Sequence, residues 1–399
     1  MSLKAASSSW LSDRYPMKAI REVLSRQAHK LLPRHVGWFH TLGGMLVFLT
    51  AHQIVTGILL MVYYRPSPEA AHESVRFLMT RPSFGWLIRG LHSWGANLMI
   101  LLLLLHMVRV FVMGAFKKPR ELTWVGGVIL FFLALCFGFT GYLLPWDQRA
   151  YWATTVGTEV AHSLPWVGPA IANLLRGGDA VGAETLGRFY VAHVVALPWL
   201  LVFLVVLHIV LIRMQGLAPL DPVGKGEHPE GSDAIPFSPH HVSRELVIFP
   251  LLFALILTLV ILYPPEVGEP ADPFATPEGI KPEWYFLPTY QLLKYFPKLP
   301  GLLLSALPPL LLLVWPFLDR GKRRRPSERK VSVAIGLIAL VIFGVLGWIG
   351  HLSESERTWF GHSHHFDIFG VPHRIEQPRD QPGPPAGETS PGATTDNGR

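Results

Sequence analysis

The 399-residue sequence has a single cysteine and little charge. Cys136 lies inside an apolar run, so this chain alone cannot form a disulfide, a Cys-x-x-Cys-His haem attachment or a cysteine-ligated iron–sulfur centre. Charged residues make up 16% of the chain, whereas hydrophobic residues make up 50%. This balance excludes an ordinary soluble protein. The apolar runs approach the ~20 residues that a helix needs to cross a bilayer.

These runs predict an all-α polytopic membrane protein, in which a four-helix bundle is followed by three further helices. Residues 1–36 are basic but have no continuous apolar core, so they favour an interfacial amphipathic helix over a signal peptide. The seven expected spans are 37–64, 90–113, 122–143, 189–213, 244–263, 301–318 and 331–350.

Basic residues gather in segments 117–120 and 320–330, after the second and sixth spans. The charge pattern of membrane proteins puts such loops, and the basic N-terminus, on the cytoplasmic side. Seven spans then leave the C-terminus outside. These loops account for most of the basic character (pI ≈ 9.5), so no nucleic-acid partner is implied.

Two spans each carry a pair of histidines. His92 and His106 are 14 residues apart, which is about 21 Å and just under four turns, so they face nearly the same side. His193 and His208 are 15 apart and share a face to within roughly 60°. Ionisable groups inside a bilayer tend to mark function, and neutral imidazole is a common iron ligand. We therefore expect two bis-histidine haem sites, His92 with His193 and His106 with His208.

Glycines in the first and third spans repeat this spacing. Gly43 and Gly57 are 14 residues apart, as are Gly127 and Gly141. Glycine would let the backbone approach a flat macrocycle closely. Ordinary packing between membrane helices also uses small residues and is the alternative interpretation.

Three more polar residues of the spans allow two interpretations. Arg89 and Arg109 lie just outside the histidines of the second span and could bind haem propionates through a bidentate fork. They could equally be snorkelling anchors. His52 has no evident partner at its depth, so a hydrogen-bonded structural role is favoured over a ligand role.

Two long outside loops, 144–188 and 264–300, are expected to be functional because loops of this length in compact proteins usually are. The second contains Pro282-Glu283-Trp284-Tyr285, which combines a stiff backbone, interfacial aromatics and a carboxylate. As a bare tetrapeptide it could also be a helix start with an acid in its first turn.

Together, these spans, histidine pairs, glycines and the Pro-Glu-Trp-Tyr motif resemble cytochrome b of the quinol-oxidising bc complexes, over about residues 33 to 350. The chloroplast-type branch is the most similar, on the 15-residue histidine spacing and on the segments 84–89, 116–124 and 141–147. Residues 264–318 resemble that branch's separate subunit IV, and the eighth helix of mitochondrial relatives is missing. The expected organisation is 1–36 interfacial, 37–220 di-haem, 221–352 subunit IV-like and 353–399 a disordered tail.

The resemblance implies a quinol:cytochrome c or plastocyanin-type oxidoreductase core that runs a Q cycle in the cytoplasmic membrane. It implies two non-covalent haems b, the outer held by His92 and His193 and the inner by His106 and His208. The implied partners are a Rieske iron–sulfur protein, a c-type cytochrome and quinone, in a complex that forms a homodimer.

The resemblance also implies two quinone pockets. At the outer one, Glu283 would be the base, because burial brings a carboxylate's pKa towards its working range. Tyr142 would share the catalytic role there, and Pro282, Trp284 and Tyr285 would line the pocket. The inner pocket would contain Arg213, Arg244 and Glu245, with Glu245 handling protons.

One position departs from the chloroplast pattern. A cysteine of the first helix attaches an extra haem in that branch, but Thr41 occupies the matching position here, so no covalent haem is expected. Two rival functions remain. A di-haem anchor of another respiratory oxidoreductase would not need the Pro-Glu-Trp-Tyr loop, and a proton-coupled transporter using histidine relays would carry no haem.

Overall fold

The computed structural model describes residues 10, 12–33, 35–218, 235–277, 279–359 and 361–375. Seven helical spans in this part are long and apolar enough to cross a membrane, which confirms the predicted number and class. The protein is therefore a multi-pass helical membrane protein. The spans are Leu42–Met61 (α3), Gly85–Val112 (α5), Glu121–Leu143 (α6), Ala183–Gln215 (α9 and α10), Phe237–Leu262 (containing α11), Lys298–Leu318 (α13) and Lys330–Leu352 (α14).

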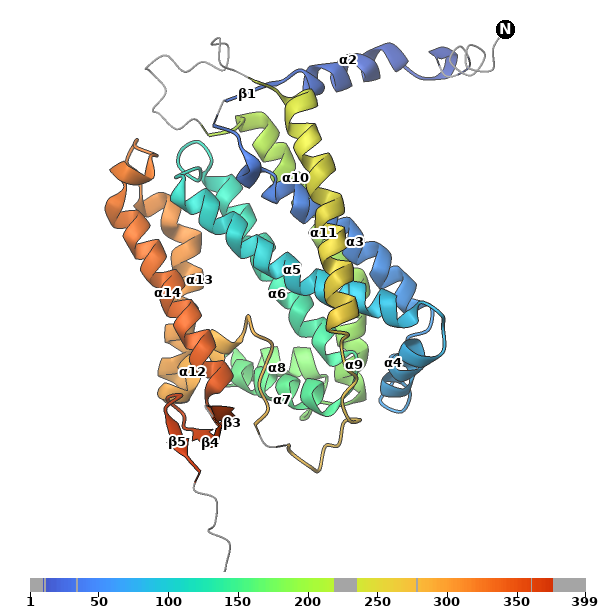
Figure 1. The fold of residues 1–399 in the computed structure, drawn as a ribbon, viewed down its shortest axis with the longest axis vertical. Helices are drawn as coiled ribbons and strands as arrows, with labels where there is room; N and C mark the ends of the chain where they lie inside the picture. Colours follow the sequence, from blue (N-terminus) through green and yellow to red (C-terminus); the bar gives the residue numbers. More distant parts are fainter. Residues whose placement is uncertain are drawn as a thin grey trace, which may run out of the picture.

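The first four spans form the bundle, with α3 against α5 and α6 against α10 (Leu197–Gln215). The fifth span, α11 (Val242–Leu262), covers α3 and α5 (Figure 1). Its Leu252, Ile256 and Val260 are buried in one cluster with apolar side chains of both helices. Thus α11 packs on the four-helix bundle, although the sequence assigned it to the subunit IV-like part. The boundary expected at residue 220 lies outside the described residues.

The fourth span changes helix type around His193. Helix α9 (Ala183–Val191) passes into a π-helical segment, Ala192–Ala196, before α10 begins. The Leu197 N–H bonds to the Ala192 carbonyl five residues back, and Pro198 has no N–H to offer. A π turn absorbs one residue. His193 and His208, although 15 residues apart, therefore lie on one face of the span, as His92 and His106 do at a separation of 14 residues in α5.

Figure 1 shows the connecting segments gathered at two opposite ends. One end holds α2 (Met17–Ala28) and the loops after α5 and α13. The other holds α4 (Ala71–Thr80), α7 (Gln148–His162), α8 (Gly168–Arg176) and α12 (Leu287–Tyr295). The N-terminal segment and both basic loops thus share one end, as their charge pattern requires.

The two basic loops are tied together by a buried ionic cluster. Lys117 Nζ lies 2.6 Å from one carboxylate oxygen of Asp319, and Arg329 Nη2 lies 2.7 Å from the other. These three side chains are only 5%, 13% and 3% exposed in the order Lys117, Asp319, Arg329. Part of the positive charge here is therefore structural, because it joins the α5–α6 loop to the α13–α14 loop.

The two long loops at the opposite end also meet. Residues Asp147 and Pro270 form an isolated antiparallel bridge, and the Gln148 N–H bonds to the Glu269 carbonyl at 2.9 Å. The Asp147 carboxylate also caps α7 by accepting from the Ala150 N–H at 2.8 Å. A segment from each predicted functional loop thus contributes to one surface.

The disorder expected from residue 353 is wrong for residues 355–375 in the described part. Strands β3 (Ser355–Trp359), β4 (His362–Phe366) and β5 (Pro372–Arg374) form an antiparallel sheet. Phe366 is fully buried, and the Gln291 side chain of α12 donates to the Ile368 carbonyl at 2.6 Å. These contacts give a polar, proline-containing segment a core. Residues 376–399 lie outside the described residues. A second small sheet pairs β1 (Leu31–Leu32) with β2 (Ile235–Pro236).

Candidate functional site

The histidine pair predicted to be the outer one, His92 and His193, joins α5 to the π-helical segment. The imidazole rings of His92 and His193 face each other with centroids 6.3 Å apart and planes at 70°. An iron with two axial imidazoles, each nitrogen about 2.0 Å from the metal, needs ring centres roughly 6 Å apart. The observed spacing fits that requirement without movement of either helix.

The described residues contain no group of three or more His, Cys, Asp or Glu side chains placed to hold a metal ion. A pair of imidazoles supplies only two ligands. A site of this kind therefore suits an iron whose other positions are already filled, as a porphyrin fills them. The geometry favours haem over a bare cation.

Each of the four predicted glycines abuts one of the four histidines. A Cβ atom built on Gly141 would lie 2.6 Å from His193 Cε1, and one on Gly57 would lie 3.3 Å from His92 Cε1. A Cβ atom on Gly127 would lie 3.3 Å from His208 Cε1, and one on Gly43 would lie 3.8 Å from His106 Cε1. The glycines of α3 thus face the histidines of α5, and those of α6 face His193 of the π-helical segment and His208 of α10. Close approach is needed most at Gly141, where any side chain would displace the imidazole.

Threonine hydroxyls fix both outer imidazoles. Thr56 Oγ1 donates to the His52 carbonyl and lies 2.9 Å from His92 Nδ1. Thr140 Oγ1 donates to the Cys136 carbonyl and lies 3.1 Å from His193 Nδ1. With its proton directed at the carbonyl, each hydroxyl oxygen can accept a hydrogen bond from an Nδ1–H group. That tautomer leaves the Nε2 lone pair for a metal.

The pair predicted to be the inner one, His106 and His208, lines a cavity of about 730 Å³, called the inner cavity below. Within the described part of the chain, the buried Nδ1 atoms of both rings have no hydrogen-bond partner. Gly43 and Gly127 line the same cavity. Each pair therefore has one glycine of α3 and one of α6 against its rings, but the polar surroundings of the two pairs differ.

The two predicted propionate-binding arginines differ in their contacts. Arg109 lines the inner cavity, and its buried Nε has no partner among the described residues, so the guanidinium is available for an anion. Arg89 instead donates to the Pro265 and Glu266 carbonyls at 2.7 and 2.9 Å. In this structure Arg89 fastens the start of loop 264–300 to α5, which neither sequence interpretation anticipated.

The inner cavity also contains two of the three residues expected at an inner quinone pocket. Arg213 lies over the Phe237 ring at 5.4 Å, and Glu245 Oε1 lies 3.5 Å from His241 Nε2. Arg244 is not among the cavity-lining residues. It donates to the Val36 carbonyl at 2.6 Å, which ties α11 to the segment before α3.

Basic side chains predominate around this cavity, and Glu245 is the one acid among its described lining residues. Burial, with the nearby charges of Arg109, His35 and His241, lowers the pKa of His40 to about 3. His40 is therefore neutral at physiological pH. A cavity of this composition suits an anionic or strongly polarised ligand.

At the outer end, Glu283 precedes a turn that leads into α12, and its carbonyl accepts from the Phe286 N–H at 2.8 Å. The carboxyl group is half-buried. Burial raises the pKa of Glu283, and the positive charge of Arg149 opposes that rise. A carboxyl group in such surroundings exchanges protons nearer to neutral pH than an exposed one.

The aromatic residues beside Glu283 anchor this loop on the bundle. Trp284 Nε1 donates to Asn97 Oδ1 of α5 at 2.8 Å. The Tyr285 hydroxyl packs on α6, where a Cβ on Gly138 would lie 2.6 Å from it. Burial raises the pKa of Tyr285, and the proximity of Glu283 and Tyr142 adds to the rise. The structure thus brings Glu283, Tyr142 and Tyr285 together.

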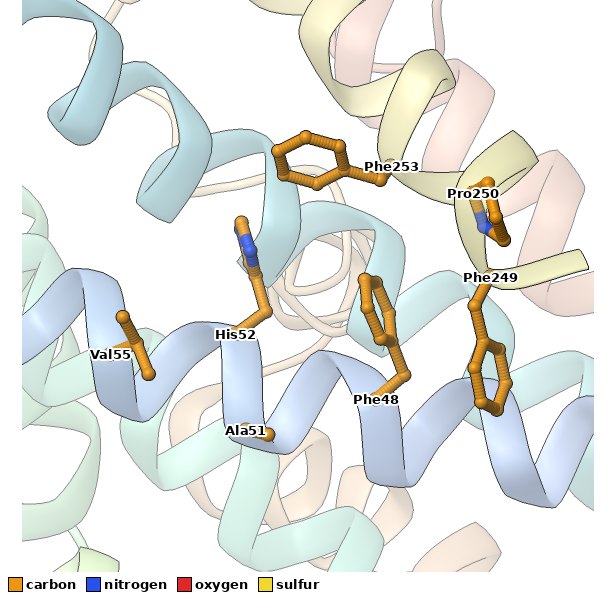
Figure 2. Close-up of a pocket in the computed structure, with 7 residues that line it drawn as sticks. All are labelled: Phe48, Ala51, His52, Val55, Phe249, Pro250 and Phe253. Atoms are coloured by element: carbon orange, nitrogen blue, oxygen red, sulfur yellow. The ribbon is translucent and has the colours of Figure 1, made fainter. Parts of the chain in front are cut away.

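His52 has the structural contacts that the sequence favoured. Its Nε2 lies 3.0 Å from the Leu91 carbonyl, and the neighbouring Gln53 donates to the His92 carbonyl at 2.9 Å. Figure 2 shows Phe48 and His52 reaching from α3 toward Phe249 and Phe253 of α11, around an apolar groove. The hydrogen bonds of His52 and Gln53 hold α3 against α5 next to His92.

Sequence reasoning missed several residues of these sites. The repeated dipeptides Thr56-Gly57 and Thr140-Gly141 carried a detectable signal, because the threonines keep the glycine spacing. Asn97 and Arg149 had no signal of their own, since each acts through a residue far away in the chain. His241 precedes Glu245 by one helical turn and could have been found from that spacing.

The fold and the paired histidines define a class, a multi-pass membrane protein whose four-helix bundle is shaped for haem. Comparisons with known proteins agree. Residues 27–216 match the family model described as cytochrome b/b6/petB, and residues 270–368 match cytochrome b(C-terminal)/b6/petD. The chain is 37% identical over 351 residues to a cytochrome bc complex cytochrome b subunit of Chlorobaculum thiosulfatiphilum, covering 86% of this chain and 80% of that protein.

Two further comparisons point the same way. The chain is 44% identical over 209 residues to cytochrome b6 of Synechococcus elongatus, covering 52% of this chain and 96% of that protein. A chain of a hyperthermophilic respiratory Complex III superposes with a TM-score of 0.79 at 29% identity, covering 87% of this chain and 92% of its own. This protein belongs to the cytochrome b family. It is a haem b-binding electron-transfer subunit of the bc type.

Proposed function

We propose that this chain is the cytochrome b subunit of a quinol:cytochrome c, or plastocyanin-type, oxidoreductase that runs a Q cycle. The observation that carries the proposal is the facing of His92 and His193 at 6.3 Å, with a glycine against each ring. The half-buried Glu283 near this end and the basic cavity at the other support one quinone site on each side of the membrane.

His92 with His193, and His106 with His208, would each hold one haem b without a covalent bond. The two haems, when bound, supply one-electron carriers between the two faces of the membrane. Arg109 would bind an inner propionate through its free guanidinium edge. The contacts of Arg89 with loop 264–300 favour a role in holding the outer pocket instead.

At the outer site, Glu283 would accept a proton from bound quinol. Burial raises the pKa of its carboxyl group, and the positive charge of Arg149 opposes that rise. Tyr142, Pro282, Trp284 and Tyr285 would shape the pocket and exclude water. Asn97 would fix the orientation of Trp284.

At the inner site, Arg213 and the His241–Glu245 pair would orient a quinone and deliver protons to it from the cytoplasmic side. The His241–Glu245 distance of 3.5 Å supports proton sharing between the two groups. Arg244 would act indirectly, by holding the Val36 segment at the pocket rim. Taking protons up inside and releasing them outside would build the proton gradient.

The remaining proposals concern the complex. A Rieske iron–sulfur protein would take one electron at the outer face, and a c-type cytochrome would follow it. The complex would be a homodimer in the cytoplasmic membrane, with the N-terminus inside and the C-terminal sheet outside. We keep the division into 37–220 for the haems and 221–352 for the subunit IV-like part as a functional proposal.

Haem stoichiometry tests the proposed function. The complex is purified in detergent, and haem is extracted with acidified acetone and assayed per mole of this 44.6 kDa chain. We expect two haems b in the extract and none left on the chain, because Thr41 offers no thiol and Cys136 lies within α6. A colourless preparation would leave the transporter function, and haem retained on the washed chain would contradict non-covalent binding.

A further inference from the structure

Two hydroxyl groups distinguish the outer histidine pair from the inner one. Resting on the proposed bis-histidine sites, we propose that Thr56 and Thr140 tune the outer haem. They fix the Nδ1–H tautomer of His92 and His193 and lower the midpoint potential of that haem. Both threonines are positioning residues, because they act through the ligands.

The contacts of the two hydroxyls are nearly equivalent. Thr56 Oγ1 lies 2.9 Å from His92 Nδ1 and Thr140 Oγ1 lies 3.1 Å from His193 Nδ1. Each hydroxyl also donates to a carbonyl four residues back in its own helix, at 2.8 Å in both cases. That second bond orients the oxygen lone pairs toward the imidazole. Both outer ligands therefore have an acceptor held in position by the helix.

Among the described residues, no such acceptor contacts Nδ1 of the inner ligands. Each threonine directly precedes its glycine, Thr56 before Gly57 and Thr140 before Gly141. One haem level away, Leu42 precedes Gly43 and Gly126 precedes Gly127, and neither has a hydroxyl. Within the described residues the buried Nδ1 atoms of His106 and His208 accordingly have no hydrogen-bond partner.

Backbone carbonyls do not account for the difference. His193 lies near the Phe137 carbonyl and His208 lies near the Thr123 carbonyl, in each case the residue four before the glycine. For these two ligands the carbonyl position is the same at both levels, and within the described residues it gives His208 Nδ1 no hydrogen bond. Within the described residues, a threonine hydroxyl contacts Nδ1 of both outer ligands, whereas Nδ1 of the two inner ligands has no such contact.

The direction of the effect follows from ligand basicity. An acceptor on Nδ1–H draws the proton outward and makes Nε2 a stronger donor to the metal. A stronger donor stabilises the ferric state over the ferrous state, so the midpoint potential falls. Cations around the inner cavity, Arg109 among them, raise the potential of the inner haem independently. Both effects increase the difference between the two midpoint potentials. The test must therefore follow the potential of each haem separately.

The test is an optical redox titration of the purified complex carrying Thr56→Val, Thr140→Val or both, with each haem resolved as its own wave. We expect the outer wave to shift to higher potential, most in the double variant, while the inner wave stays in place. Thr56→Ser and Thr140→Ser keep the hydroxyl group, so the outer wave should keep its wild-type midpoint potential. Thr258→Val is the matched control, because the exposed Thr258 of α11 makes the same bond to a carbonyl four residues back and contacts no histidine ligand.

Gly126→Ser provides the converse test. A Cβ on Gly126 would lie 3.8 Å from His208 Nδ1, an ordinary contact from which a serine hydroxyl can reach that nitrogen. We expect the inner wave to move to lower potential and the outer wave to remain unchanged. This variant keeps the proposal testable if the valine variants lose the outer haem.

The outcomes separate this inference from the proposed function. Two titrating haems in the wild type support the proposed function whatever the threonine variants do. An unshifted outer wave in a double valine variant that keeps both haems would overturn the tuning role. So would an inner wave unmoved by Gly126→Ser. A wild-type chain with no haem wave would overturn the proposed function itself.

Discussion

Glu283 is the residue whose proposed chemistry depends most directly on its surroundings. Burial raises the pKa of its carboxyl group, so the ionised base forms only as the pH rises through that raised value. Turnover should therefore increase with pH along a limb that belongs to Glu283. Glu283→Gln keeps the size but cannot ionise, so we expect that limb to vanish and quinol:cytochrome c reductase activity to fall by up to roughly 100-fold.

Arg149→Gln provides the companion variant, because the positive charge of Arg149 lowers the pKa of Glu283. Its removal should shift the same limb to higher pH while the maximal rate stays near wild type. Both profiles are measured in membranes with matched haem spectra. If Glu283 is only the first-turn acid of a short helix, Glu283→Gln will keep both the wild-type rate and the wild-type profile.

Site residues were predictable where a single residue type repeated at a helical spacing. The four histidines and four glycines are of this kind, and the structure brings each histidine against one glycine. Arg89 and Arg244 were assigned from their neighbours in sequence, yet their guanidinium groups donate to carbonyls more than 170 residues away. Such long-range partners leave no local pattern to detect.

At the scale of the helices, the glycines of α3 and α6 give a graded prediction. Gly141→Ala should disturb the outer haem most, because the new Cβ would lie 2.6 Å from His193. Gly57→Ala and Gly127→Ala, at 3.3 Å, should have intermediate effects, and Gly43→Ala, at 3.8 Å, should have the least. The readout is haem content and the low-spin spectrum of each b haem.

Gly344→Ala is the control for this series, since a Cβ there meets nothing within 4 Å. It should leave both haems intact. An equal loss of haem from all five variants, or normal spectra for Gly141→Ala, would mean that the glycines serve general helix packing.

The ionic cluster between the loops predicts a stability effect. Burial alone would raise the pKa of Asp319, but the hydrogen bonds from Lys117 and Arg329 outweigh it and hold the pKa below its usual range. The cluster therefore stabilises the fold above the ordinary aspartate pKa of 3.8, and its contribution is lost as the pH falls through the lowered value. Asp319→Asn should cost about 3 kcal/mol, because two buried cations lose their carboxylate.

Thermal unfolding of the purified protein at pH 7, followed by loss of the haem spectrum, measures this cost. Glu73→Gln is the control, because the Glu73–Arg76 pair is 65% exposed on both sides and should contribute little. Equal melting temperatures for the two variants would show that the buried cluster does not join the loops energetically.

The ends of the membrane spans were predictable to within seven residues because hydrophobic length largely determines a membrane span. The π-helical segment at Ala192–Ala196 was not predicted, because the 15-residue histidine spacing was interpreted on a regular α-helix. A strict 3.6-residue helix would have turned His193 and His208 about 60° apart. The observed facing of His92 and His193 reflects the extra residue in that segment.

For the molecule as a whole, the sequence predicted the class and the grouping of the loops at two ends. It did not predict that α11 would pack on α3 and α5, nor that residues 355–375 would fold. Both depend on tertiary contacts: the apolar face of α11 has a partner only in the bundle, and the C-terminal sheet has a core only when Phe366 is buried. Polar composition alone favours disorder and cannot register such contacts.

The central claim is that two histidine pairs hold two haems at separate depths, and His106→Leu tests it most directly. Redox titration of the wild-type complex should resolve two b-haem waves of distinct midpoint potential, because the polar surroundings of the pairs differ. In His106→Leu the inner wave should disappear and the outer wave should remain, since His92 and His193 are untouched. Two waves that survive the substitution unchanged would contradict the pairing proposed for this protein.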